Sequence, residues 1–290
     1  GSRSVISYAQ LRVAAGKVAA QLLAAGIQPG DRVAGFMPNR TETLIAALGA
    51  AWIGAVWSSC SPDFGVSGVL DRFGQIEPKV LIAQDGYVHA GKTVDRREIL
   101  AGLEAALPSL VQCVTVPFVG DLPKGHMAWD SLLDRDAPYE STQVPFDHPL
   151  WIVYSSGTTG NPKPIVHGHG GIILESAKQS LHHDLRRGGR YCWLTSSGWI
   201  MWNSQFTALG QGTTVAMFDG APNYPDMGVI WRFVADEKLD FFGAGAAFFS
   251  GCMKAGLTPR DEVDLSALRS LGSTGSPLSS DAYDWIYAQV

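Results

Sequence analysis

Short apolar runs, rich in β-branched and aromatic residues, alternate along the chain with longer segments of helical periodicity. Strand and helix pairs of this kind are expected at residues 32–37 and 41–54, 80–83 and 96–107, 191–195 and 202–209, and 214–218 and 227–237. Strands that alternate with helices are typical of βαβ units, whose strands pair in parallel. The pattern therefore predicts an α/β fold with largely parallel sheets flanked by helices.

Residues 116–149 interrupt this alternation with several prolines, glycines and charges and with little periodicity. Such a stretch between two periodic halves indicates a long connection. We therefore expect two α/β subdomains, residues 1–149 with the excursion near 116–149, and residues 150–290. The last expected helix begins near Ser280 and reaches Val290 without a glycine or proline terminator, so we expect the second subdomain to be truncated there.

Composition narrows the class of protein. With 46% hydrophobic and 17% charged residues, the chain is too apolar for disorder. A formal net charge of −5 offers no basic surface for nucleic acid or an anionic membrane, and neither partner is expected. The longest apolar run, residues 44–57, is too short for a membrane span. Four widely separated cysteines without a CxxC pair indicate neither a zinc ribbon nor a disulfide framework, which favours the cytoplasm.

The largest group of candidate functional residues lies within residues 154–171, which read YSSGTTGNPKPIVHGHGG. A predicted strand end leads into small hydroxyl and glycine residues and then a lysine. Glycines let backbone N–H groups converge, hydroxyls add donors, and a lysine adds positive charge, which together favour phosphate binding. The candidate phosphate-binding residues are Ser155, Ser156, Gly157, Thr158, Thr159, Gly160 and Lys163.

The common nucleotide motifs do not account for this loop. The P-loop pattern GxxxxGK[ST] would need glycine where Pro162 stands, and no GxGxxG follows a predicted strand. A plain connecting loop is the structural alternative, but strand, glycines, hydroxyls and lysine together favour a phosphate site. His167 and His169 could bind a metal only with a third ligand, and the sequence indicates none. Packing is therefore favoured over metal binding, and no metal site is expected.

The stretch SSGTTGNPKPIVHGH, residues 155–169, resembles the phosphate-binding signature of the adenylate-forming superfamily, which contains acyl-CoA synthetases, luciferases and the adenylation domains of peptide synthetases. Pro164 replaces the usual glycine, and in this the chain resembles the acetoacetyl-CoA synthetases. Residues 55–81, 194–206 and 268–279 resemble further segments of the same enzymes. The segments that follow in relatives, including a small C-terminal domain with its adenylation lysine, would lie beyond Val290.

The resemblance implies an AMP-forming acid–thiol ligase. A carboxylate, here acetoacetate, attacks the α-phosphorus of ATP to give acetoacetyl-AMP, and coenzyme A then displaces AMP. The resemblance gives Lys163 and Thr158 catalytic roles at the phosphates, with Mg²⁺ carried by the nucleotide. A ligase for acetate or propionate and a non-catalytic nucleotide-binding module are the alternatives. We expect the 290 residues alone to be inactive, and the oligomeric state is left open.

Two further segments match substrate positions of the family. The resemblance places the acid beside Trp199, with Ile200, Met201 and Trp202 lining its pocket and Asn203 donating to a keto oxygen. By spacing alone, a buried core stripe is favoured for Trp199 and Trp202. The resemblance gives adenine contacts to Gly275, Ser276 and Pro277 and the closing of the acyl pocket to Thr274; a serine at 279 or 280 also predicts a helix N-cap.

Overall fold

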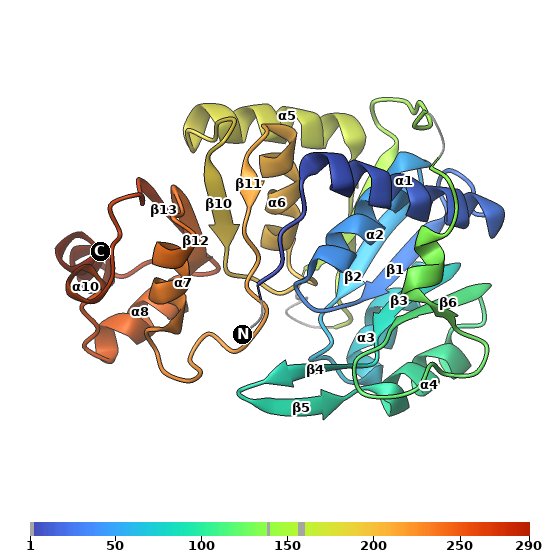
Figure 1. The fold of residues 1–290 in the computed structure, drawn as a ribbon, viewed down its shortest axis with the longest axis horizontal. Helices are drawn as coiled ribbons and strands as arrows, with labels where there is room; N and C mark the ends of the chain where they lie inside the picture. The colour runs from blue at the N-terminus through green and yellow to red at the C-terminus, as the bar shows by residue number, and fades with distance from the viewer. Residues whose placement is uncertain (1–2, 138–139, 156–159) are drawn as a thin grey trace. The chain divides into compact units, whose positions relative to one another are not determined.

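The computed structural model describes residues 3–137, 140–155 and 160–290. Its helices and strands alternate as expected, and its sheets are largely parallel, so the predicted α/β class is confirmed (Figure 1). The chain forms two compact units. Unit 1 comprises Gly1–Tyr87, Thr93–Ile172 and Ser196–Ile200, and unit 2 comprises Val88–Lys92, Ile173–Thr195 and Met201–Val290.

Unit 1 is built on a seven-stranded sheet of order β7-β6-β3-β1-β2-β8-β9. Its strands are β1 (Arg32–Phe36), β2 (Val56–Cys60), β3 (Val80–Gln84), β6 (Gln112–Val116), β7 (Met127–Ala128), β8 (Pro149–Ser155) and β9 (Lys163–Gly168). The pairs from β7 to β8 are parallel, whereas β8 and β9 are antiparallel. Parallel order places the carboxyl ends of β1, β2 and β8 at one edge, where ligands of open α/β sheets bind.

The helices of unit 1 are α1 (Tyr8–Ala24), α2 (Thr41–Trp52), α3 (Val66–Phe73), α4 (Arg97–Ala106) and the 3₁₀ helix η1 (Trp129–Leu133). α1 begins at a capping box in which Ser7 and Gln10 exchange side-chain and backbone hydrogen bonds. The central strands β2 and β3 are buried along their whole length. Phe36, Phe73 and Leu103 pack in one core between the sheet and the helices α3 and α4.

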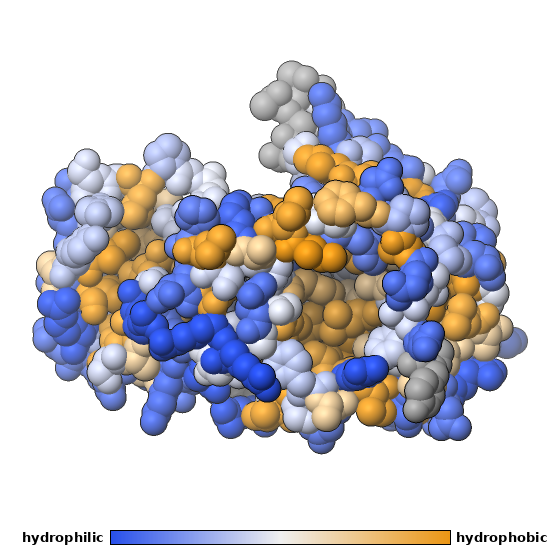
Figure 2. Space-filling model, turned by 90° about the horizontal axis from the view of Figure 1, so that it is seen from above, coloured by the Kyte–Doolittle hydropathy of each residue, from blue (hydrophilic) through white to orange (hydrophobic). Residues whose placement is uncertain are grey.

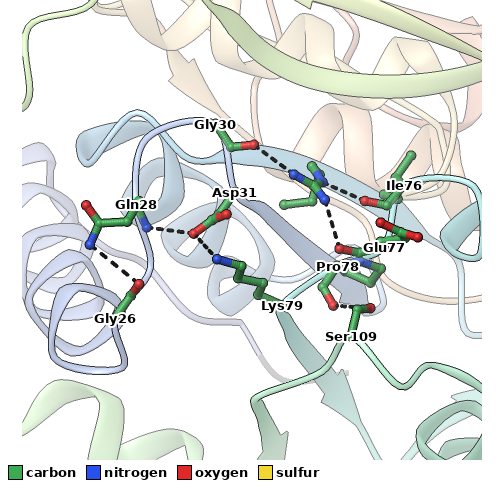
Figure 3. A network of polar contacts seen from close by, with 10 residues as sticks. Gly26, Gln28, Gly30, Asp31, Ile76, Glu77, Pro78, Lys79 and Ser109 are labelled. Atoms are coloured by element: carbon green, nitrogen blue, oxygen red, sulfur yellow. Dashed lines mark hydrogen bonds and ion pairs between the residues drawn. The ribbon is translucent and has the colours of Figure 1, made fainter.

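A polar network closes the opposite, amino-terminal edge of this sheet (Figure 3). One oxygen of Asp31, Oδ2, accepts hydrogen bonds from the backbone N–H of Gln28 at 2.8 Å and from Lys79 Nζ at 2.9 Å. The Arg32 guanidinium donates to the backbone carbonyls of Ile76 and Glu77. These bonds join the start of β1 to the residues that precede β3.

Unit 2 contains a four-stranded parallel sheet of order β11-β10-β12-β13. Its strands are β10 (Arg190–Trp193), β11 (Thr214–Val215), β12 (Phe241–Gly245) and β13 (Ser270–Thr274). Its helices are α6 (Ile200–Gly210), α7 (Val229–Asp236), α8 (Ala246–Lys254), α9 (Pro259–Glu262) and α10 (Ser280–Gln289). Trp231 is buried at the centre of its aromatic core, 5.8 Å from the Phe242 ring.

Several elements continue across the division of the chain, and α6 is one of them, since its first residue, Ile200, belongs to unit 1. The helix α5 (His169–His182) has its first turn in unit 1 and the remainder in unit 2, and the hairpin β4 (Gly86–His89) and β5 (Lys92–Asp95) is likewise divided. Three large apolar side chains of α5 are exposed: Ile173, Leu174 and Leu181. Figure 2 shows hydrophobic residues at the surface on this side of the molecule.

The division into these two units differs from the boundary expected at residues 149 and 150. β8 pairs with β2, and β9 pairs with β8, so both strands complete the sheet of unit 1 rather than opening a second subdomain. The excursion near 116–149 likewise holds β7 and η1, which contact β6. The described part of the chain contains no helix long and apolar enough to cross a membrane.

Candidate functional site

The two ends of the predicted phosphate loop lie side by side at the end of the β8–β9 hairpin. In the antiparallel register Ser155 is paired with Lys163 and Tyr154 with Pro164. Ser155, Gly160 and Lys163 are exposed. Ser156, Gly157, Thr158 and Thr159 lie outside the described residues. The strand ends therefore present a hydroxyl and a lysine on adjacent strands at the carboxyl end of β8.

The base of the loop is attached to the end of α3. The Tyr154 hydroxyl donates to the Arg72 carbonyl at 3.0 Å, and burial raises the pKa of this phenol, so it stays a neutral donor. Gln75 Nε2 donates to the Pro162 carbonyl at 2.8 Å. The Arg72 guanidinium itself lies over the Phe64 ring, 4.5 Å from its centroid. These contacts hold both ends of the loop to one helix.

The two histidines after Lys163 make packing contacts. The His167 ring lies 6.4 Å from the Trp151 ring, and the His169 ring lies 5.8 Å from that of His148. Burial lowers the pKa of His169, and the neighbouring His148 lowers it further, which keeps His169 neutral near pH 7. This geometry fits the packing role that the sequence favoured.

A short segment of unit 1, Ser196–Ile200, carries Trp199 past the ends of β1 and β2. Ser59 Oγ donates to the Ser197 carbonyl at 2.5 Å, and Ser197 Oγ donates to the Met37 carbonyl at 2.5 Å. Gly198 lies so close to β2 that an added Cβ would stand 3.2 Å from Cys60 Cα. Sequence reasoning missed this positioning role, although the paired serines and the glycine beside Trp199 were visible in SSGW.

The residues assigned to the acid pocket differ in their exposure. Trp199 is half-buried and Ile200 is 38% exposed, and both belong to unit 1. In unit 2, Met201 is half-buried, while Trp202 and Asn203 are 0% and 4% exposed. The Trp202 ring packs edge-on against Phe206 at 5.4 Å. Trp202 therefore occupies a core position, as its spacing also allowed. Trp199 and Ile200 keep exposed surface that a ligand could contact.

The second predicted contact segment follows β13 in unit 2. Thr274 ends the strand opposite Gly245, and Gly275, Ser276 and Pro277 are exposed. Gly275 has φ +90°, a left-handed conformation that favours glycine. Ser279 then caps α10 by accepting a hydrogen bond from the Ala282 N–H, one of the two caps predicted. The segment is an exposed turn between β13 and α10.

Cys60, which lies at the end of β2, is fully buried. Burial raises the pKa of its thiol to about 12. The thiolate needed for nucleophilic chemistry is therefore disfavoured.

Comparisons with known proteins give a consistent result. Residues 1–290 match the family described as AMP-binding enzyme. The acetoacetyl-coenzyme A synthetase of Rhizobium meliloti (strain 1021) is 42% identical over 98% of this chain and 45% of its own length. The acetoacetyl-CoA synthetase of Gallus gallus is 37% identical over 98% of this chain and 45% of its own length.

Among solved structures, the acetoacetyl-CoA synthetase from Streptomyces lividans matches with a TM-score of 0.95 at 44% identity. The match covers 99% of this chain and 45% of that one. This chain thus spans less than half the length of the relatives it matches. These similarities confirm the resemblance found in the sequence.

Proposed function

Since the chain belongs to the family of AMP-binding enzymes, we propose that its natural gene product activates acetoacetate with ATP and transfers the acyl group to coenzyme A. In the first step a carboxylate oxygen attacks the α-phosphorus of ATP, and the bond to pyrophosphate breaks. In the second step the thiol of coenzyme A attacks the acyl carbon, releases AMP and gives up its proton. Both products are then free to leave.

The observation that carries this proposal is the pairing of Ser155 with Lys163 across the β8–β9 hairpin. Negative charge builds up on the bridging oxygen of the departing pyrophosphate, and a fixed ammonium group stabilises it best when it needs no rearrangement. Lys163 is carried on a strand that is hydrogen-bonded to β8, so its backbone is fixed. Thr158 and the remaining hydroxyls of the loop would donate to the same phosphates.

The co-substrates and cofactor follow from this chemistry. ATP would be held by the phosphate loop and by the turn at Gly275, Ser276 and Pro277, whose exposed backbone suits contact with a flat base. Mg²⁺ would neutralise the phosphates and travel with the nucleotide. Coenzyme A is the acyl acceptor of the second step. The four free thiols of the chain support a reducing, cytoplasmic location.

For the acid we propose contacts with Trp199 and Ile200, which expose surface, and with Met201. Thr274 would close the pocket. Asn203 is almost fully buried and supplies a fixed amide donor, which suits the keto oxygen that distinguishes acetoacetate from acetate. The buried Trp202 would shape the pocket through its packing.

The proposal is tested by acid-dependent exchange of pyrophosphate into ATP, measured on the natural gene product. Acetoacetate, acetate, propionate and a no-acid control are compared. Exchange selective for acetoacetate is the expected result. Selectivity for acetate or propionate would assign a different short acid, and saturable ATP binding without exchange would show a nucleotide-binding module instead.

A further inference from the structure

Three side chains with different metal-binding atoms converge in unit 1 at the edge formed by β6 and β7. Glu104 lies on α4, Cys113 on β6, and His126 immediately before β7. One ligand atom from each, a carboxylate oxygen, Sγ and an imidazole nitrogen, lie within 4.8 Å of one another. Sequence reasoning missed this group because its members stand on three different elements and match no spaced motif.

The imidazole is held in an orientation that suits a ligand. Its Nδ1 lies 2.6 Å from Thr115 Oγ1, and Thr115 is fully buried. Its Nε2 faces the Glu104 carboxylate, close enough for an ion pair when the imidazole is protonated. Metal-binding histidines commonly use one ring nitrogen for the metal and fix the other with a hydrogen bond. Here the bond at Nδ1 leaves Nε2 pointing into the cluster.

We propose that Glu104, Cys113 and His126 bind one Zn²⁺ ion. Thiolate, imidazole and carboxylate are the three ligand types that zinc takes in proteins. The Glu104 side chain is 33% exposed whereas that of His126 is 5% exposed, so solvent reaches the cluster at the glutamate. Water completes a tetrahedral set from that side.

A reactive cysteine is the competing interpretation of this cluster. Burial raises the pKa of the Cys113 thiol to about 12, and the Glu104 carboxylate adds to the effect. The metal-free cysteine is therefore a neutral thiol and a poor nucleophile. Zn²⁺ displaces the thiol proton on binding and so turns the cysteine into a thiolate ligand.

The site is separate from the proposed phosphate site. In the sheet order, β3, β1 and β2 stand between β6 and β8. The three ligands join a helix, a strand and the end of the irregular stretch between β6 and β7. The ion would thus stabilise this edge of unit 1 and take no part in adenylation.

Titration of the metal-free chain with Co²⁺, followed by competition with Zn²⁺, tests the proposal. We expect one Co²⁺ per chain with a thiolate-to-cobalt charge-transfer band, which Zn²⁺ then removes. Cys113→Ala loses the band, whereas Cys252→Ala, which removes a buried cysteine in unit 2, keeps it. A band that survives in Cys113→Ala, or no stoichiometric binding to the folded chain, overturns the proposal.

A second measurement does not depend on the cysteine variant folding. Zn²⁺ should raise the melting temperature of the wild-type chain by a few degrees, because it binds only the folded state. Glu104→Gln keeps the shape of the side chain and removes its charge, so zinc affinity should fall at least tenfold and the shift should shrink. Equal shifts in the wild type and in Glu104→Gln would also refute the site.

Discussion

Lys163 lies directly across from Ser155 in the antiparallel pairing of β8 and β9. The lysine therefore has a backbone position set by a strand, although it follows a loop rich in glycine and hydroxyl residues. A charged side chain whose backbone is fixed can stabilise a transition state well. It loses little conformational freedom when negative charge develops on the reacting groups. This relationship favours a role for Lys163 in turnover over a role in holding adenine.

Replacement of Lys163 by alanine should lower the kcat of acetoacetate-dependent exchange about 100-fold in the natural gene product, because one preorganised donor to the leaving pyrophosphate is lost. The KM for ATP should change much less. Steady-state exchange kinetics at varied ATP separate the two effects.

Lys124→Ala is a matched control, since Lys124 is an exposed lysine of the stretch between β6 and β7. It should leave both parameters unchanged. A Lys163→Ala enzyme with normal kcat and a raised KM for ATP would contradict the proposed role.

Trp199 and Trp202 should differ in what their replacement by alanine does to stability and to use of the acid. Trp202 is fully buried, so Trp202→Ala should lower the free energy of unfolding by about 3–5 kcal/mol. Trp199 is half-buried, and Trp199→Ala should cost less stability but lower kcat/KM for the acid more. Urea unfolding and exchange kinetics on both variants check this, and equal losses of stability would contradict it.

Asn203→Ala tests the proposed keto contact. Removal of the amide should reduce the preference for acetoacetate over acetate about 10-fold, because a hydrogen bond to the keto oxygen is lost while acetate has none to lose. Competition between the two acids in the exchange assay measures this ratio. An unchanged preference would remove Asn203 from the pocket.

Much of the fold could be predicted from local patterns. The helix expected at residues 41–54 is α2, Thr41–Trp52, and it leads into the buried strand β2. Helical and strand periodicities are formed by residues close together in the sequence, so they can be recognised without knowledge of the tertiary structure. The phosphate loop could be predicted for the same reason, because its candidate residues are contiguous in sequence.

The remaining features depend on pairing between distant segments. Nothing in the composition of residues 149–168 shows that β8 pairs with β2, and so the expected division at residue 149 differs from the observed units. The bond from Ser59 to Ser197 joins positions 138 residues apart. Burial of Trp202 beside a half-buried Trp199 depends on which face of α6 meets its neighbours, and the spacing left this open.

The turn after β13 offers a test of backbone geometry. Gly275 has φ +90°, so Gly275→Ala should cost about 1–2 kcal/mol of stability and weaken ATP binding as the turn rearranges. Gly171 on α5 is exposed and has open space around an added Cβ, so Gly171→Ala should be neutral or stabilising. Thermal unfolding and ATP titration of both variants check the contrast, and a neutral Gly275→Ala would refute it.

Acid should weaken unit 1 through Asp31. Burial acts to raise the pKa of Asp31, but the hydrogen bonds from Lys79 and the Gln28 N–H, with the charges of Lys79 and Arg32, outweigh it and hold the pKa below its ordinary value. The resulting stabilisation is fully present above the unfolded pKa of about 3.9 and is lost as pH falls through the lowered folded-state pKa.

Asp31→Asn should therefore lower the free energy of unfolding by about 1 kcal/mol at pH 7 and reduce the loss of stability below pH 4. Urea unfolding between pH 2 and pH 7 measures both effects. Asp136→Asn, at an exposed aspartate, is the control and should follow the wild-type curve. Identical pH profiles for Asp31→Asn and the wild type would contradict the assignment.

Gly198 should be as important for use of the acid as the side chains proposed to contact the acid. An added Cβ would stand 3.1 Å from the Ser61 nitrogen and 3.2 Å from Cys60 Cα, both backbone atoms that cannot rotate away. Gly198→Ala should therefore push the segment off β2 by a few tenths of an ångström and displace Trp199.

We expect the KM of Gly198→Ala for acetoacetate to rise about 10-fold while ATP binding is unchanged, since the phosphate loop is attached separately to α3. Exchange kinetics at varied acid, with ATP titration in parallel, measure the two effects, and a variant that loses stability but keeps its KM would leave Gly198 a packing residue only.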